Sequence, residues 1–356
     1  MTMASLLRMN GARGALALAA VAGCTALTLA GCATEPLKPA VIPAHAEAPP
    51  PVALSGKVIE AASEYHIYVQ RASQIRPSFT TGPQIEESLT MGEGYEAQQL
   101  SRGIIAYGAL VALQDPSFVA SVRTYAVDPD GRRSLAAKLV SDPSYAAALP
   151  NAPSAAGLVI STLTNDSARM RGAGEMVKQF AYDVQHQAWS KKDITDPVGR
   201  LAYAKQVSSA PMTPVPDDVE QLKGAVSGPD SKVASRAMLV SGRASGPPYT
   251  AVVTRALAVA ALAALGEGGD ENDAQVESVL NESSGGFCLN MSKLNLYQCL
   301  AVAKPWYEDV FCLGQHVLID TGQCVAKEVG PMQPVQAAVT PEPTQSGGPA
   351  APGAAQ

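Results

Sequence analysis

Cysteine is the residue type with the clearest chemical potential in this 356-residue chain. Four of its six cysteines lie in one stretch near the C-terminus: Cys288, Cys299, Cys312 and Cys324. Thiols can bind a metal, exchange redox equivalents or pair as disulfides, and the first two uses commonly need a CxxC spacing. No CxxC occurs in the chain. The spacing therefore favours structural disulfides over a zinc site or a redox centre.

The pairing of these cysteines follows from the helices expected around them. The sequence predicts helices over 289–303 and 305–316, joined by a turn at Lys304-Pro305. Four cysteines allow three pairings. A bridge within the first helix would join residues ~15 Å apart, whereas a disulfide needs Cα atoms within about 7 Å. Both nested pairs are centred on the turn, so we predict Cys299–Cys312 and Cys288–Cys324.

Cys324 sets a condition on this helical hairpin. On a continuous helix it would lie about 120° away from the face of Cys312, twelve residues earlier. The nested pairing then requires the second helix to end before Cys324. Thr321-Gly322 offers a stop, because glycine commonly terminates helices. We expect the second helix to end there.

Two glycine-containing motifs admit both a functional and a structural interpretation. Residues 92–97 fit a G-x-G-x-x-A string, but a dinucleotide-binding loop needs a preceding strand, and the residues before it predict a helix. The run 266–273 holds Asp270, Asn272 and Asp273, whose oxygens could bind calcium, although its spacing does not fit an EF-hand. We favour a helix break for the first motif and a capping loop before a helix at 274–280 for the second.

Histidines and aromatic residues provide the remaining candidates. Asp183 and His186 lie at positions i and i+3 of an expected helix, a spacing that can present two metal ligands on one face. Neither they nor His66 and His316 stand in a metal-binding motif. A further group could line a peptide or sugar groove, or serve as core anchors, which we favour: Trp189, Trp306, Tyr65, Tyr68, Tyr107 and Tyr182.

No local signature of catalysis is present. The chain has neither a G-x-S-x-G elbow nor an S-x-x-K pair. We therefore predict no catalytic, cofactor-binding or metal-binding residue. An enzyme is the less favoured class, although a triad assembled from distant residues stays open as an alternative.

The N-terminus has the pattern of a secretory signal. Arg8 and Arg13 precede an apolar run over 14–31 that contains no acidic residue. Leu29-Ala30-Gly31-Cys32 resembles the lipobox of bacterial lipoproteins. The resemblance covers only this segment, and it implies acylation of Cys32 and cleavage before it. Because Ala33 rather than Asp follows, it further implies an outer-membrane location.

Two alternatives to this anchor are weaker. Val21-Ala22-Gly23-Cys24 also fits a lipobox, but cleavage there would leave an apolar stretch at the start of the mature chain. An uncleaved membrane span would need ~20 apolar residues, and the run is interrupted by Thr25 and Thr28. We therefore expect anchoring at Cys32 in the cell envelope, facing the periplasm, with surface exposure or release as alternatives.

Composition favours a helical protein and argues against nucleic-acid binding. After removal of 1–31 the chain has 24 basic and 32 acidic residues, a formal charge of −8, whereas nucleic acid needs a concentrated basic surface. The chain is 47% hydrophobic but only 5% aromatic, with much alanine, which suits helices. Asp-Pro steps at 115–116, 142–143 and 196–197 predict capped helix starts.

Helical periodicity extends through most of the chain. Apolar residues recur every three or four positions over 58–72 and 170–184, and 249–265 is apolar on almost every side, which predicts a buried central helix. The expected fold is all-α with a disulfide-stapled C-terminal hairpin. The expected segments are a signal peptide (1–31), a lipidated Pro-rich tether (32–53), a helical domain (54–285), the hairpin packed on it (286–328) and a disordered tail (329–356).

These features favour a structural or partner-binding lipoprotein of the cell envelope, without cofactor. Its expected partners are the membrane, through the lipid on Cys32, and other envelope proteins. The alternatives are a small-ligand-binding accessory lipoprotein that uses an apolar groove, and a periplasmic hydrolase with a dispersed site.

Overall fold

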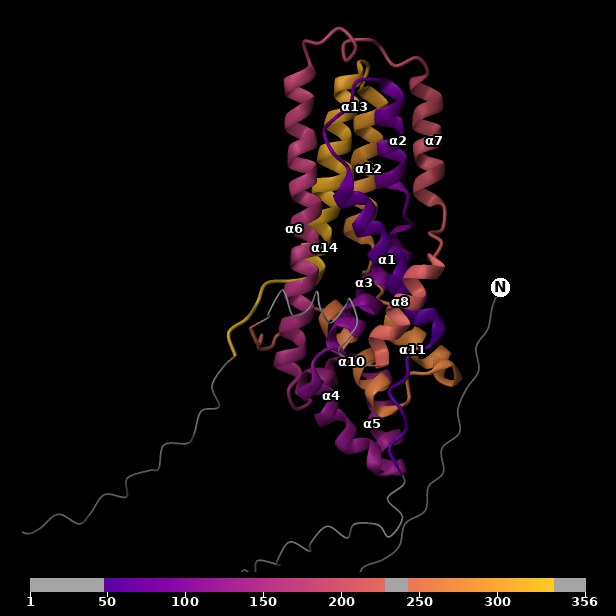
Figure 1. Ribbon diagram of the computed structural model, residues 1–356, viewed down its shortest axis with the longest axis vertical. Helices are drawn as coiled ribbons and strands as arrows, with labels where there is room; N and C mark the ends of the chain where they lie inside the picture. The colour runs from indigo at the N-terminus through magenta and orange to yellow at the C-terminus, as the bar shows by residue number, and fades with distance from the viewer. Residues whose placement is uncertain (1–47, 228–242, 336–356) are drawn as a thin grey trace, which may run out of the picture. The chain divides into compact units, whose positions relative to one another are not determined.

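A computed structural model describes residues 48–227 and 243–335 (Figure 1). Within these ranges the chain forms thirteen α-helices and short 3₁₀ and π segments, and it forms no strand. The prediction of an all-α fold is confirmed for the described residues. The predicted signal peptide, the lipobox at Cys32, and most of the predicted tether and tail lie outside them.

The centre of the fold consists of helices rich in small residues. Helix α3 (Ala97–Ala112) and helix α10 (Ala251–Leu265) are buried along most of their lengths. Helix α1 (Gly56–Gln74) packs on α3, and a Cβ at Gly103 would lie only 2.7 Å from the carbonyl oxygen of Ala61. Small side chains thus let these helices approach closely. The predicted central helix over 249–265 is confirmed as α10.

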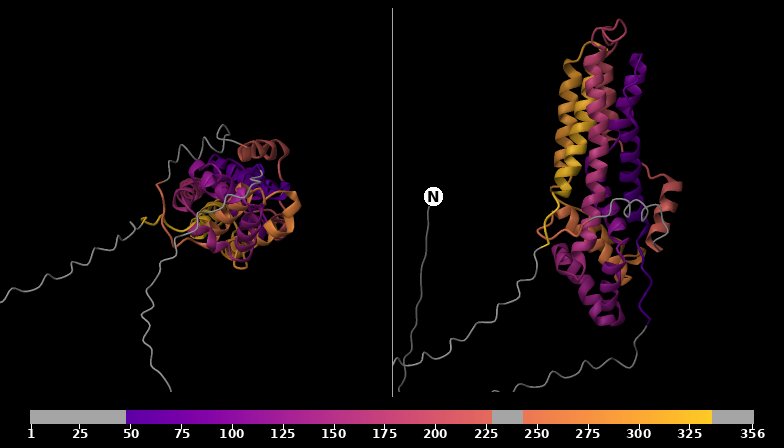
Figure 2. Two further views of the ribbon diagram at one scale, coloured as in Figure 1. Left: turned by 90° about the horizontal axis from the view of Figure 1, so that it is seen from below. Right: turned by 60° about the vertical axis from the view of Figure 1, so that its left-hand side comes forward.

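The longest described helix, α6 (Ala152–Val184), runs beside the last helical segments of the chain (Figures 1 and 2). Glycines line this contact. A Cβ at Gly174 would lie 2.7 Å from the carbonyl oxygen of Gly314, and one at Gly322 would lie 2.7 Å from Cγ of Arg171. Larger residues at these positions would push the helices apart.

In the predicted C-terminal hairpin the first helix has the expected length, and the second helical segment is longer than expected. Helix α12 (Phe287–Val302) is followed by α13 (Trp306–Cys312), a π-helical segment η4 (Leu313–Ile319) and α14 (Asp320–Val329). The expected stop at Thr321-Gly322 is wrong, since the helical path continues to Val329. The nested pairing is nevertheless confirmed: the Cα atoms of Cys288 and Cys324 are 5.5 Å apart, and those of Cys299 and Cys312 are 5.8 Å apart.

Shorter helices complete the described residues, and aspartates begin several of them. Asp115 and Asp196 accept hydrogen bonds from Phe118 N and Gly199 N, and Asp142 begins a 3₁₀ turn, so the expected Asp-Pro caps are confirmed. Asp128, which also precedes a proline, caps one more helix. The elements are α2 (Gly82–Glu93), α4 (Pro116–Arg123), η1 (Thr124–Val127), α5 (Pro129–Ser141), η2 (Pro143–Ala148), α7 (Pro197–Ser209), α8 (Pro216–Ser227), η3 (Asp270–Asn272) and α11 (Asp273–Leu280).

The described parts of the predicted tether and tail are bonded to the helices. Arg123 Nη1 donates to the carbonyl oxygen of Pro50 at 3.0 Å, and Ala53 N donates to Ala263 O at 3.2 Å. Near the other end, Gly246 N donates to Gln333 O at 3.0 Å. Residues 50–53 and 330–333 are therefore attached to the helical unit.

No single described helix is both long and apolar enough to cross a bilayer. One pair meets the length and composition criteria only when taken together, across an 86° bend: α3 with the segment 116–127.

Candidate functional site

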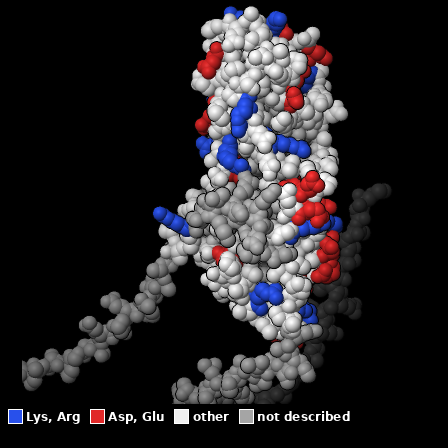
Figure 3. Space-filling model, in the orientation of Figure 1, with Lys and Arg blue, Asp and Glu red and all other residues white. Residues whose placement is uncertain are grey.

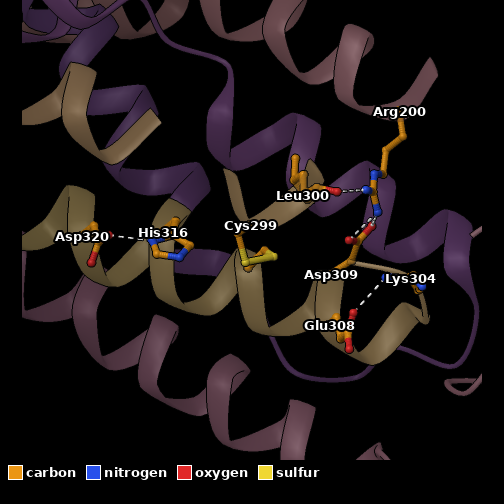
Figure 4. Close-up of a disulfide and its surroundings, with 9 residues drawn as sticks. Arg200, Cys299, Leu300, Lys304, Glu308, Asp309, His316 and Asp320 are labelled. Atoms are coloured by element: carbon orange, nitrogen blue, oxygen red, sulfur yellow. Dashed lines mark hydrogen bonds and ion pairs between the residues drawn. A yellow bond between two sulfur atoms is a disulfide. The ribbon is translucent and has the colours of Figure 1, made fainter. Parts of the chain in front are cut away.

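An open groove of about 320 Å³ lies between α6, α12 and α13. Its position is set by the Cys299–Cys312 disulfide, which joins the C-terminal turn of α12 to the end of α13 and forms part of the wall (Figure 4). The lining is mainly apolar and aromatic. It comprises Ala181, Tyr182, Gln185, Cys299, Val302, Ala303, Tyr307, Glu308, Phe311 and Cys312. We call this the stapled groove.

The rim of the stapled groove exposes apolar surface. The Val302 side chain is 76% exposed and Tyr182 is 49% exposed. The rings of Tyr182 and Phe311 meet edge to face with centroids 6.1 Å apart, and Lys178 Nζ lies 5.2 Å from the Phe311 centroid. These contacts hold aromatic faces at the surface, which is typical of sites that bind apolar partners.

One carboxylate lies among the described lining residues. Glu308 Oε2 accepts a hydrogen bond from Lys304 N at 2.8 Å (Figure 4). This bond secures the Lys304-Pro305 turn at the start of α13 and occupies one oxygen of the carboxylate. The described lining thus carries one formal negative charge among otherwise uncharged side chains.

A buried ion pair fixes α7 against α12 and α13 beside the groove. Arg200 Nη1 lies 2.5 and 2.6 Å from the two carboxylate oxygens of Asp309, and its Nη2 donates to the carbonyl oxygen of Leu300 (Figure 4). Burial raises the pKa of Asp309 to about 6, and the neighbouring guanidinium opposes that shift. The pair orients the helix that carries Phe311 and Cys312.

A buried lysine joins α12 to the ends of two other helices. Lys293 Nζ donates to the carbonyl oxygens of Tyr95 at 2.5 Å, Ser208 at 2.6 Å and Glu93 at 3.4 Å. It also lies 3.9 Å from the centroid of the Tyr95 ring. Burial lowers the pKa of Lys293 to about 7 and raises that of Glu93 to about 7. Glu93 Oε2 is buried without a hydrogen-bond partner in the described part of the chain.

The histidines are held in separate local contacts. His66 Nδ1 lies 2.8 Å from Asp218 Oδ1, and its ring stacks on Tyr107 with centroids 5.3 Å apart. His316 Nδ1 lies 2.8 Å from Asp320 Oδ2, one helical turn later (Figure 4). His186 lies beyond the end of α6 at Val184, so the premise that it shares a helix with Asp183 is wrong.

Both glycine-containing motifs have structural roles. Residues 92–97 span the break between α2 and α3, as favoured. In the acidic run, Asp270 Oδ1 accepts from Gly56 N at 2.7 Å and Asp273 pairs with Lys57 at 3.4 Å. The run therefore caps the distant helix α1 as well as starting α11. Acidic side chains gather on this side of the molecule, where α8 and α11 lie (Figure 3).

The described residues contain no group of three or more His, Cys, Asp or Glu side chains placed to hold a metal ion. Of the predicted aromatic group, Tyr65, Tyr68 and Tyr107 are core residues, and Trp189 and Trp306 pack partly buried against the core. The core interpretation is wrong for Tyr182, which lies on the groove rim.

The sequence interpretation missed the groove residues on α12 and α13. One signal was present in the sequence: α12 carries a single charged residue, Lys293, and is apolar on several sides. Comparison with known proteins adds no assignment, since no family model, curated protein or solved structure matches the chain.

Proposed function

We propose that this protein is an exported lipoprotein of the cell envelope that binds an apolar segment of another envelope protein in the stapled groove. The single observation that carries the binding role is the groove itself: an aromatic and aliphatic surface, held open by a disulfide, with its rim residues exposed. Exposed apolar surface of this kind marks interaction sites in proteins.

The lipobox-like sequence at Cys32 and the two disulfides support the cellular location. Disulfides form and persist in oxidising compartments such as the bacterial periplasm. The chain between Cys32 and residue 48 is rich in proline, and sixteen residues at about 3.1 Å each would reach about 50 Å. We propose attachment to the outer membrane, with the helical unit in the periplasm and no role in nucleic-acid binding.

The anchor is tested by Cys32→Ala. We expect loss of lipid labelling and release of the protein from the membrane fraction, because the thiol that receives the lipid is gone. Cys24→Ala is the matched control and should leave both unchanged in the mature chain. A mature N-terminus other than residue 32, found by mass spectrometry, would contradict the proposal.

The binding role is tested by charge on the groove rim. Val302→Glu and Tyr182→Glu place a carboxylate where an apolar partner must be desolvated, and both side chains are exposed enough for the fold to tolerate them. Val198→Glu, on α7 at a residue that is 79% exposed and does not line the groove, is the control.

Full-length protein would be cross-linked in cells, recovered from envelopes and examined for covalent adducts. We expect adducts that disappear with both rim variants and persist with Val198→Glu. Adducts that survive both rim variants would overturn the proposed site.

A small apolar ligand is the second candidate, because the groove volume lies at the lower end of the range of ligand pockets. Native mass spectrometry of protein taken from envelopes distinguishes the two. A co-purifying small molecule lost with Val302→Glu would favour the ligand, and its absence together with a rim-sensitive protein adduct would favour the partner protein.

A further inference from the structure

A second pocket, of about 260 Å³, lies between the second half of α1, the end of α2 and the stretch 211–213 that precedes α8. None of its lining residues lines the stapled groove. Its volume is just below the range of about 300–1,000 Å³ that holds drug-sized ligands, so an occupant would be smaller than those. We call it the α1 pocket.

One face of α1 forms the floor of the α1 pocket. Glu64, Ile67, Tyr68 and Arg71 follow the three-and-four spacing of a single helical side, and all four line the pocket. The Tyr68 side chain is buried, and its hydroxyl donates to Gly92 O at 3.0 Å, which fixes the ring. The floor therefore has a rigid aromatic centre, with a carboxylate towards one end and a guanidinium towards the other.

The wall formed by 211–213 is held in place by one amide of α3. Gln99 Oε1 accepts from Met212 N at 2.7 Å, and Gln99 Nε2 donates to Met212 O at 2.9 Å. These two bonds position a stretch that has no regular secondary structure. Met212 and, from α2, Met91 line the pocket with thioether side chains, which adapt to apolar groups of different shape.

The two charged residues of the floor are not paired with each other. Arg71 has no hydrogen bond or ion pair with any residue that the structure describes. Glu64 is half-buried, and burial raises its pKa to about 7 against a hydrogen bond from Gln99 and the charge of Arg102. A carboxylate and a guanidinium that share a pocket without pairing can each receive the opposite charge of a ligand.

We infer that the α1 pocket binds a short free peptide of two or three residues, with its terminal ammonium at Glu64 and its terminal carboxylate at Arg71. Seven residues of helix separate the Cα atoms of these residues by about 10.5 Å. Two or three residues of extended chain span about 7–11 Å, which matches that separation. The guanidinium can hold a carboxylate through two parallel hydrogen bonds.

Shorter and longer zwitterions fit the α1 pocket less well. In a free amino acid the ammonium and the carboxylate are attached to one carbon, so the molecule cannot reach both Glu64 and Arg71. A longer peptide exceeds both the separation of the two charges and the volume of the pocket. This inference concerns a site apart from the stapled groove and does not depend on the groove's partner.

Isothermal titration calorimetry of the full-length protein in detergent, with alanylalanine as the probe, tests the inference. We expect one saturable site with a Kd below about 1 mM. Free alanine, N-acetyl-alanylalanine and alanylalanine amide should each bind at least tenfold more weakly, because each lacks one of the two contacts.

Variants of the two charged residues assign each contact. Glu64→Gln and Arg71→Gln should each weaken the binding of alanylalanine at least tenfold. Glu64→Gln should no longer distinguish the N-acetylated ligand from the free one but should still distinguish the amide, and Arg71→Gln should show the reverse. A merely structural effect would weaken all ligands alike. Glu87→Gln and Arg133→Gln, at exposed positions outside the pocket, are the matched controls and should leave binding unchanged.

Three results would overturn the inference. These are no saturable binding of alanylalanine by the wild-type protein, equal affinity for the free and the blocked dipeptides, or unchanged affinity in both charge variants. None of them bears on the proposed function, which is tested by the groove rim. Conversely, loss of groove adducts in Val302→Glu with alanylalanine binding intact would separate the two sites.

Discussion

At the scale of single residues, Lys293 serves as a shared cap for helix ends. Its three carbonyl acceptors belong to Glu93 at the end of α2, to Tyr95 just beyond it, and to Ser208 in the last turn of α7. The last carbonyls of a helix have no partner within it and carry its negative dipole end. One ammonium group therefore satisfies three carbonyl groups at the ends of two helices, which explains why a charge is kept inside.

Glu93 and Lys293 predict a pH dependence of stability. The pKa of Glu93 is raised to about 7 in the folded protein, so the folded state binds more protons than the unfolded state between about pH 4.5 and 7. Its contribution to the free energy of unfolding falls as pH rises through this window. The pKa of Lys293 is lowered to about 7, so its contribution rises with pH from about 7 towards 10.5.

Urea unfolding at a series of pH values measures this effect. Glu93→Gln should remove a decrease in stability between pH 4.5 and 7, with a slope of at most about 1.4 kcal/mol per pH unit for one proton. Lys293→Met should remove the rise above pH 7. Thr90→Val, a change at a half-buried polar residue of the same helix, is the control. Identical profiles for wild type and Glu93→Gln would contradict the assignment.

Removing one side chain of the buried Arg200–Asp309 ion pair should strongly lower the free energy of unfolding. Asp309→Ala leaves a buried guanidinium without its carboxylate and should lower the free energy of unfolding by about 3–5 kcal/mol. The exposed pair Arg133–Asp130 is the matched control, and Asp130→Ala should cost less than about 1 kcal/mol. The double variant Arg200→Met/Asp309→Leu should recover most of the loss, as chemical denaturation would show.

At the scale of elements, η4 explains how Cys324 reaches Cys288. Cys288 and Cys299 are eleven residues apart, about three helical turns, while Cys312 and Cys324 are twelve apart. A π segment accommodates one extra residue, which offsets roughly 100° of rotation about the helix axis. Cys312 and Cys324 then lie on one face of their helical segment, as Cys288 and Cys299 do on α12, although the two spacings differ by one residue.

This explanation predicts that one deletion within η4 is tolerated. Removing Gln315 should convert the π segment to α-helix and leave both native disulfides in place, at the cost of the contact between Gln315 and Lys178. Removing one residue from α12, Tyr297, should instead rotate Cys288 away from Cys324 by about 100°. Non-reducing peptide mapping identifies the disulfide pairing in both deletion variants. Mispaired cysteines after the Gln315 deletion would refute the role of η4.

The sequence predicted most of the helices. It did not predict that the helical path continues from α13 through η4 into α14. Helix starts were recognisable because Asp115, Asp142 and Asp196 each precede a proline. In the sequence Gly322 indicates a helix stop, whereas in the structure its role is close packing, since a Cβ there would contact Arg171 of α6. A glycine needed for a tertiary contact and a glycine that ends a helix look the same in one sequence. A π segment likewise has no periodic signature of its own.

At the scale of the whole molecule, the groove could not be predicted because its walls come from distant parts of the chain. Tyr182, Val302 and Phe311 belong to three helices, and their proximity follows from packing of α6 on the stapled segments. The disulfide pairing was predictable because both pairs are centred on one turn, although the π segment that brings Cys324 to Cys288 was not.

The two disulfides are predicted to contribute unequally to stability. Their sequence separations are 36 and 13 residues, and loop-closure entropy gives about 4 kcal/mol for the outer bridge and about 3 kcal/mol for the inner one. Replacing Cys288 and Cys324 by alanine should therefore lower the free energy of unfolding more than replacing Cys299 and Cys312. Urea denaturation without reductant measures both, and a larger loss for the inner pair would contradict this expectation.

The nested order of these bridges has a consequence for biogenesis. A chain that crosses the inner membrane from its N-terminus delivers Cys288 and Cys299 to the periplasm before Cys312 and Cys324. An oxidase that joins cysteines in order of arrival would produce Cys288–Cys299, which is not a native pair. Native protein then requires either that both helical legs form before oxidation or that an isomerase reshuffles the first bridge. Exported in this way, the protein would depend either on early folding of both helices or on disulfide isomerisation, although each of its bridges closes within one hairpin.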